Sequence, residues 1–165
     1  MIKLRALRIS DAEKMYEFFS DSDIANNFIF TRTPFSIETL VEFIKSSWND
    51  RNNVHFAMVE DNDEYIGTIS LKNINFIDRN AEYAIMVGKE YWGTGYALEA
   101  TNRIIEYGFK KLNLNKIYLN VLANNLRANK FYEKYGFIKE GTFKNHIYNN
   151  GEYVDLNWYC IFSKL

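Results

Sequence analysis

The chain has 165 residues, of which 47% are hydrophobic and 25% are charged, and its net charge is −1. This length and composition are typical of one folded domain with its own core, and they exclude a disordered or low-complexity chain. The near-neutral charge argues against a broad nucleic-acid surface, and no apolar run approaches the ~18 residues of a membrane-spanning helix.

The first fifty residues predict one strand and two helices. Apolar and charged residues alternate over residues 2–9, which is typical of a strand. Ser10 and Asp11 then start a helix, and Ser36 is a candidate N-cap for a second one. We expect residues 21–35 to form an irregular link between these two helices.

The middle of the chain predicts three strands joined by short polar turns, at about residues 54–60, 64–75 and 80–88. A helical apolar period then runs from residue 94 to residue 112. Its main face is expected to contain Leu98, Ile105, Phe109 and Leu112, beside a track of smaller residues, Ala97, Ala100, Ile104 and Gly108.

The last fifty residues predict a strand, a short helix and two more strands, at about 116–122, 126–134, 137–147 and 152–163. Gly136 is a natural left-handed cap for the helix, and Asn149-Asn150-Gly151 is a strong hairpin signal. No linker or repeat is evident. The order of elements therefore predicts a single α+β domain over residues 1–165, built around a mixed sheet.

Two simple features limit the chemistry and the location. Cys160 is the only cysteine, so the chain can form neither an internal disulfide nor a cysteine-based zinc site, and we expect no metal. The N-terminal residues 1–5 lack the apolar stretch of a signal peptide, which favours a cytoplasmic location.

The most informative segment is Val87–Ala97, which contains a strand end, a glycine loop and a helix start. Glycines let the backbone turn sharply, and the first N–H groups of a helix are free to bind an anion such as pyrophosphate. A tight turn with no ligand would explain the same glycines. A dinucleotide fingerprint is disfavoured because its third glycine would stand at Leu98, and the Gly-Lys-Ser/Thr ending of a P-loop is absent.

This loop resembles the acyl-CoA loop of the GNAT N-acetyltransferase superfamily. The general pattern, Arg/Gln-x-x-Gly-x-Gly/Ala, reads Trp92-x-x-Gly95-x-Ala97 here. The tryptophan departs from the general pattern but matches the Tyr-Trp-Gly-x-Gly-Tyr-Ala variant of the branch that acetylates ribosomal-protein termini. A second stretch, Asn125-x-x-Ala128-x-x-x-Tyr132-x-x-x-Gly136-Phe137, resembles the other GNAT hallmark at every marked position. The likeness is good over residues 64–165, and over residues 1–50 it is limited to the order of elements.

The resemblance implies a sheet of about seven strands, mostly antiparallel, flanked by about four helices. It also implies direct transfer of acetyl from acetyl-CoA to a primary amine, with no covalent enzyme intermediate. The residues implied to bind acetyl-CoA are Ile85, Met86, Val87, Trp92, Gly93, Thr94, Gly95, Tyr96, Ala97, Asn125, Ala128, Asn129, Phe131 and Tyr132. Among these, the backbone of residues 85–87 would pair with the pantetheine arm and polarise the acetyl carbonyl.

Two residues are candidates for proton transfer. The resemblance implies that Tyr132 protonates the departing CoA thiolate, and a phenol of pKa ~10 suits a thiol of pKa ~8.5. A tyrosine facing a core would also be ordinary at this position. Glu82 is a candidate base, because we expect apolar neighbours on its strand face, Ala84 and Met86, to raise its pKa. A water chain could serve equally, and we expect the two histidines, His55 and His146, to be structural.

The acceptor should be covered by residues 10–50, in which Phe28, Phe30, Arg32 and Phe35 are candidate pocket residues. Residues 1–64 contain 12 acidic and 7 basic residues, whereas residues 65–165 contain 9 acidic and 13 basic residues. The acidic first part favours a cationic amine, although chance scatter over solvated faces explains the division equally well. The resemblance leaves open a polyamine, a protein N-terminus or an amino group on a nucleotide-linked sugar, and it leaves self-association open. The alternative is a non-catalytic acyl-CoA-binding module.

Overall fold

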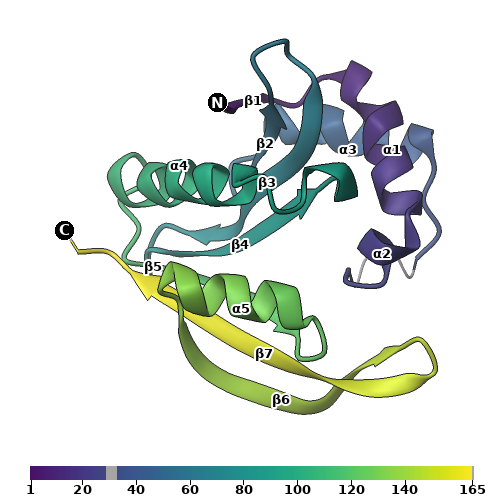
Figure 1. The fold of residues 1–165 in the computed structure, drawn as a ribbon. Helices are drawn as coiled ribbons and strands as arrows, with labels where there is room; N and C mark the ends of the chain where they lie inside the picture. The colour runs from purple at the N-terminus through teal and green to yellow at the C-terminus, as the bar shows by residue number, and fades with distance from the viewer. Residues whose placement is uncertain (29–32, 165) are drawn as a thin grey trace.

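The computed structural model describes residues 1–28 and 33–164, and within them seven strands form one mixed sheet in the order β1-β2-β3-β4-β5-β7-β6 (Figure 1). The strands are β1 (Lys3–Ala6), β2 (Val54–Val59), β3 (Tyr65–Asn75), β4 (Asn80–Val87), β5 (Lys116–Leu122), β6 (Ile138–Asn149) and β7 (Glu152–Phe162). The helices are α1 (Ala12–Ser20), α2 (Ser22–Ala25), α3 (Ile37–Ser47), α4 (Tyr96–Lys110) and α5 (Leu126–Tyr135), with 3-10 turns η1 (Ile9–Asp11) and η3 (Lys89–Tyr91).

The predicted fold class is confirmed, with one helix more than expected. The additional helix is the four-residue α2, which lies in the segment predicted to be an irregular link. The side chain of Asp21 caps it by accepting a hydrogen bond from the Asp23 N–H at 2.8 Å. Among residues 1–28 and 33–164, no helix has the length and apolarity needed to span a bilayer.

The sheet opens between β4 and β5. All other neighbouring strands pair antiparallel, whereas β4 and β5 are parallel and joined through the crossover helix α4. Their pairing covers only Asn80–Glu82 of β4 and Lys116–Tyr118 of β5. Beyond these residues the strands separate, and Figure 1 shows β4 and the β5–β7 pair diverging.

One face of the sheet carries α4 and α5. The buried face of α4 contains Ala100, Thr101, Ile104, Ile105 and Gly108. On the predicted main face, Ile105 is buried and Phe109 and Leu112 pack against the core, but Leu98 is 48% exposed. Much of the predicted track of smaller residues is buried as well. The reason is the short distance between helix and sheet, because a Cβ on Gly108 would lie 2.8 Å from the Ile117 side chain.

The other face carries the N-terminal helices. Apolar residues of α1 and α3, among them Met15, Phe18 and Ile44, form a second core with Ala57 and Met86. The predicted N-cap of α3 is confirmed: Ser36 Oγ accepts from the Thr39 N–H at 3.2 Å, and Thr39 Oγ1 accepts from the Ser36 N–H at 2.9 Å.

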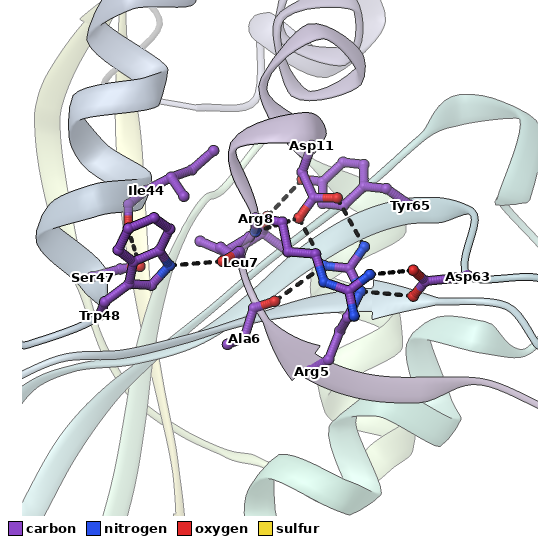
Figure 2. A network of polar contacts seen from close by, with 11 residues as sticks. Arg5, Ala6, Leu7, Arg8, Asp11, Ile44, Ser47, Trp48, Asp63 and Tyr65 are labelled. Atoms are coloured by element: carbon purple, nitrogen blue, oxygen red, sulfur yellow. Dashed lines mark hydrogen bonds and ion pairs between the residues drawn. The ribbon is translucent and has the colours of Figure 1, made fainter.

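Ion pairs fix the start of α1 to the sheet (Figure 2). Arg5 donates to both carboxylate oxygens of Asp11, at 2.8 and 2.9 Å, and also to Asp63 at 2.8 Å. Asp11 is only 3% exposed and also accepts from the Arg8 N–H. The side chain of Arg8 pairs with Asp63 as well. Several acids of the N-terminal part are therefore bound to arginines within the fold.

The C-terminal hairpin is confirmed at the predicted turn, where Asn150 and Gly151 have φ values of 52° and 83°. Positive φ at both central residues is the geometry of a type I′ turn, which explains the Asn-Gly signal. Beside the turn, Asn149 Nδ2 donates to the Asn26 carbonyl at 2.9 Å. This hydrogen bond ties the hairpin to the end of α2.

The close packing of β3 against β4 at Gly67 leads to a testable prediction. A Cβ on Gly67 would lie 2.2 Å from the Met86 carbonyl oxygen, which is backbone and can yield only if the strands move. We expect Gly67→Ala to lower the free energy of unfolding by about 1–3 kcal/mol in urea denaturation. The matched control is Gly141→Ala in β6, where an added Cβ meets nothing within 4 Å. Equal stability of the two variants would contradict this account.

Candidate active site

A cavity of about 660 Å³ occupies the opening between β4 and β5. This volume lies within the usual range for small-molecule sites. The glycine loop and α5 line it from one side, while Lys72, Glu82 and Asn120 line it from the opposite face of the sheet, with the end of α2. The cavity therefore passes through the sheet and can bring two reactants together from its two faces.

The glycine loop has the geometry of an anion cradle. Gly93 and Gly95 have φ values of 79° and 89°, so glycine is needed there for the backbone conformation. No atom lies within 4 Å of the Cβ positions that these glycines lack, and both glycines line the cavity with Ala97. The N-cap Gly95 has no side chain to cap α4, and the Tyr96 N–H donates to Thr94 Oγ1 at 3.3 Å. The next N–H groups, those of Ala97 and Leu98, are available to an anion.

Two residues of the loop use their side chains elsewhere. Thr94 Oγ1 donates to the Tyr91 carbonyl at 2.6 Å, and the Tyr96 hydroxyl donates to Glu60 at 2.5 Å. Neither Thr94 nor Tyr96 lines the cavity. Any contact of these two residues with a ligand would therefore come from the backbone.

Trp92 fastens the loop to β4. Its indole Nε1 donates to the Val87 carbonyl at 3.1 Å, and the Arg127 guanidinium lies 3.2 Å from the centre of its ring. Both residues line the cavity, and burial lowers the pKa of Arg127. The sequence analysis did not single out Arg127. The sequence offered one signal for Arg127, namely its position two residues after Asn125, the predicted N-cap of α5.

One edge of β4 is free to bind a ligand. Ile85, Met86 and Val87 pair with β3 on one side, but the pairing with β5 has ended at Glu82. All three residues line the cavity. Unpaired backbone groups need a partner, and an extended chain with amide groups can supply it as an added strand would.

The start of α5 is held by two asparagines. Asn125 is the predicted N-cap, since its Oδ1 accepts from the Ala128 N–H at 3.2 Å. Asn129 is buried, and its Nδ2 donates to the carbonyls of Leu122 and Asn125. Asn125, Ala128 and Phe131 line the cavity, whereas Asn129 does not. Its side chain therefore anchors α5 to the end of β5.

Tyr132 projects from α5 into the cavity. Its ring contacts several aromatic rings, with Tyr83 at 5.9 Å between centroids and Phe137 at 5.6 Å. No described residue makes a hydrogen bond to its hydroxyl, which leaves that group available to a ligand. Burial raises the pKa of Tyr132, so the phenol stays protonated at neutral pH and can act as a donor.

Glu82 lines the same cavity from the opposite face of the sheet, but its expected apolar surroundings were wrong. Its carboxylate is 3.2 Å from Lys72 Nζ, and it accepts from Asn73 Nδ2 at 3.0 Å and from Asn120 Nδ2 at 3.3 Å. These partners are donors, so the site is polar. Glu82 and Tyr132 thus face one cavity from its two sides.

Of the two candidate acceptor residues that the structure describes, Phe28 lines the cavity, with Ile24 and Asn27, and Phe35 does not. Phe35 instead packs against the rings of Phe19 and Tyr16. The other two candidates, Phe30 and Arg32, lie outside the described residues.

The histidines lie away from the cavity lining. His55 Nδ1 is 2.7 Å from Ser70 Oγ, and burial lowers the pKa of its ring. His146 packs against the ring of Phe143. In the part of the chain that the structure describes, no group of histidine, cysteine and acidic residues is arranged to hold a metal ion.

Comparison with known proteins agrees with this geometry. The acetyltransferase (GNAT) domain family matches residues 2–138. A spermidine N(1)-acetyltransferase from Vibrio cholerae is 32% identical over 99% of this chain and 94% of that protein. The putative ribosomal N-acetyltransferase YdaF from Bacillus subtilis is 28% identical over 99% of this chain and 92% of its own. A crystal structure of spermidine N-acetyltransferase from Vibrio cholerae in complex with CoA and spermine has a TM-score of 0.89 and 31% identity, covering 98% of this chain and 95% of that one.

The cradle makes a prediction about donor binding. If the cradle holds the pyrophosphate of acetyl-CoA, Gly95→Asp places a carboxylate against it. We then expect acetyl-CoA affinity to fall about 100-fold or more in calorimetry, because like charges in contact cost several kcal/mol. Gly151→Asp is the matched control, since it carries the same backbone strain at a positive φ far along the chain in the hairpin turn. Similar acetyl-CoA binding by the two variants would place the donor elsewhere.

Proposed function

Since this chain belongs to the GNAT acetyltransferase family, we propose that the cavity between β4 and β5 is its active site. The protein is an acetyl-CoA-dependent N-acetyltransferase. The observation that supports this location is the shared cavity, which the glycine loop and Tyr132 line from one face and Glu82 from the other. A non-catalytic acyl-CoA-binding module is disfavoured, because relatives named as transferases match over almost the whole chain.

The donor binds on the α4–α5 side. The cradle of Gly93, Gly95 and Ala97 receives the pyrophosphate, and the free edge of β4 over residues 85–87 pairs with the pantetheine arm. Acetyl-CoA supplies the acetyl group as a thioester. We assign the whole chain to one domain, because β6 and β7 belong to the same sheet as the strands that line the site.

The transfer proceeds in one ternary complex. The amine nitrogen forms a bond to the acetyl carbon while the carbon–sulfur bond breaks. Glu82 takes the proton that the amine must lose, directly or through one water, and Tyr132 gives a proton to the departing thiolate. A backbone N–H of β4 stabilises the charge that develops on the carbonyl oxygen.

The acceptor is a small primary amine that enters from the face covered by α1 and α3. One relative is named a spermidine acetyltransferase and another a putative ribosomal N-acetyltransferase, so spermidine and ribosomal proteins are the first acceptors to test. Thiol release from acetyl-CoA in the presence of an amine panel is the direct test of the proposal. Acetyl-CoA binding without turnover on any amine would contradict it.

The role of Tyr132 predicts a separation of turnover from binding. We expect Tyr132→Phe to lower kcat by about 100-fold or more while acetyl-CoA affinity stays nearly unchanged, because only the proton donor is lost. Tyr135→Phe is the matched control on the same helix, where the hydroxyl donates to Asn102 at 2.9 Å. An unchanged kcat in Tyr132→Phe would remove it from the acid role.

The role of Glu82 predicts a change in pH dependence. A free alkylamine has a pKa near ~10.4, so without a base the reactive neutral fraction rises about tenfold per pH unit up to that value. We expect Glu82→Gln to lose about 100-fold in kcat/KM at pH 7 and to approach the wild type as pH rises toward ~10. Glu140→Gln, which breaks an exposed pair with Lys116, is the control. A loss in Glu82→Gln that is the same at every pH would argue against a base.

A further inference from the structure

Few charged side chains of the described residues line the acceptor half of the cavity. Among the described residues that line the cavity, the charged ones are Lys72, Glu82 and Arg127. Arg127 lies on the donor side, stacked on Trp92, which leaves one lysine and one glutamate for the acceptor. Residues 29–32 have the sequence Ile-Phe-Thr-Arg and therefore add no carboxylate.

The one carboxylate is already supplied with donors. Glu82 is paired with Lys72 at 3.2 Å and hydrogen-bonded by Asn73 and Asn120. A carboxylate offers about four acceptor sites, so about one remains for an incoming amine. A polyamine that reacts through one nitrogen keeps one or more ammonium groups, and each of those needs an anionic or carbonyl partner when it leaves water.

The acidic excess of residues 1–64 does not reach the cavity. Asp23, the nearest acid to the end of α2 in sequence, pairs with Lys89. Asp11 and Asp63 are bound to Arg5. The sequence-based expectation of a cationic acceptor rested on this excess, and the structure weakens that support because none of the described acids of residues 1–64 lines the cavity.

Lys72 has capacity for a second anion. Its side chain is 36% exposed, compared with 17% for Glu82. An ammonium carries three N–H donors, and Glu82 takes one of them. A ligand with an amine near Glu82 and an anionic group near Lys72 would therefore match the order of charges along this wall.

We infer that the acceptor carries one reactive amine together with a carboxylate or phosphate group, which Lys72 binds. This inference rests on the proposed function and specifies its substrate class. The ion pair between Lys72 and Glu82 orients the lysine, and Asn120, which also lines the cavity, adds a neutral donor beside it. The amine thus meets Glu82, the one carboxylate among the described residues of the cavity lining, while the anionic group meets the cation.

A matched series of acceptors tests the inference by thiol release from acetyl-CoA. The first set consists of 1-aminopentane, 5-aminopentanoate and 1,5-diaminopentane, which differ in the charge of the group at the end opposite the reactive amine. Spermidine is added as a longer amine with a cationic end. Glucosamine and glucosamine 6-phosphate form a second pair, which distinguishes phosphate from carboxylate. We expect at least one anionic member to exceed its neutral partner in kcat/KM by about tenfold or more, the effect of one charged hydrogen bond.

Variants of Lys72 show whether that preference arises at this residue. Lys72→Met should abolish the advantage of the anionic amine and leave the KM for acetyl-CoA unchanged, whereas Lys72→Arg should retain part of the advantage. Lys45→Met, an exposed lysine on α3, is the control and should behave as the wild type.

Each remaining outcome has a defined meaning. Faster turnover of the diamine or spermidine than of every anionic amine would overturn the inference and leave the proposed function standing. An equal loss with all acceptors in Lys72→Met would show that the lysine acts only by orienting Glu82, which also overturns the inference. No turnover with any amine by a protein that binds acetyl-CoA would contradict the proposed function itself.

Discussion

The parallel pairing of β4 with β5 stops at Glu82, after three residue pairs, and the rest of the site follows from that stop. Backbone groups in a folded protein need hydrogen-bond partners, and the far edge of β4 loses its neighbouring strand over residues 83–87. The aromatic rings of Tyr83, Tyr132 and Phe137 pack together on one side of the opening. The sheet is otherwise continuous, so this free edge is where an extended ligand can complete it.

The two sides of the opening are held in different ways. On one side, a buried polar network fixes α5 to β5 and β7: Asn157 Nδ2 donates to Asn129 Oδ1 at 2.9 Å, and the Tyr159 hydroxyl lies 3.0 Å from the same oxygen. Fully bonded networks of this kind specify one arrangement, because each partner is costly to leave unpaired. On the other side, the helices are held by an apolar core and by the Arg5–Asp11 pair (Figure 2). The position of Tyr132 is therefore set by polar contacts and the position of the acceptor face mainly by packing.

The sequence predicted features that depend on residues close together in the chain better than features that depend on contacts between distant segments. Caps and turns are local, so Ser36, Gly136 and the Asn150-Gly151 turn were identified correctly. On α4 only Leu98 was wrongly assigned to the main apolar face, since the close approach of Gly108 to Ile117 brings the track of smaller residues toward the sheet. That approach cannot be recognised from a pattern within the helix. The partners of Glu82 were missed for the same reason: Lys72 and Asn120 come from two different strands, one on each side of β4. The sharp turn at Gly93 and Gly95 could be predicted because this backbone conformation needs only the glycines themselves.

The difference between a local sequence property and contacts made in the fold also applies to charge. The excess of acids in residues 1–64 is a property of a segment, but a ligand responds to charges within about 8–10 Å, since salt screens those farther away. Within the fold, arginines and lysines bind most of the acids near α1 and α2, among them Asp11, Asp23 and Asp63. In the proposed active site, the donor side is determined by backbone geometry, which many sequences can share, whereas the acceptor side is determined by a few side chains on β3, β4 and β5. A lysine facing that side can therefore change the charge of the preferred amine while the glycine cradle, the open strand edge and Tyr132 stay as they are.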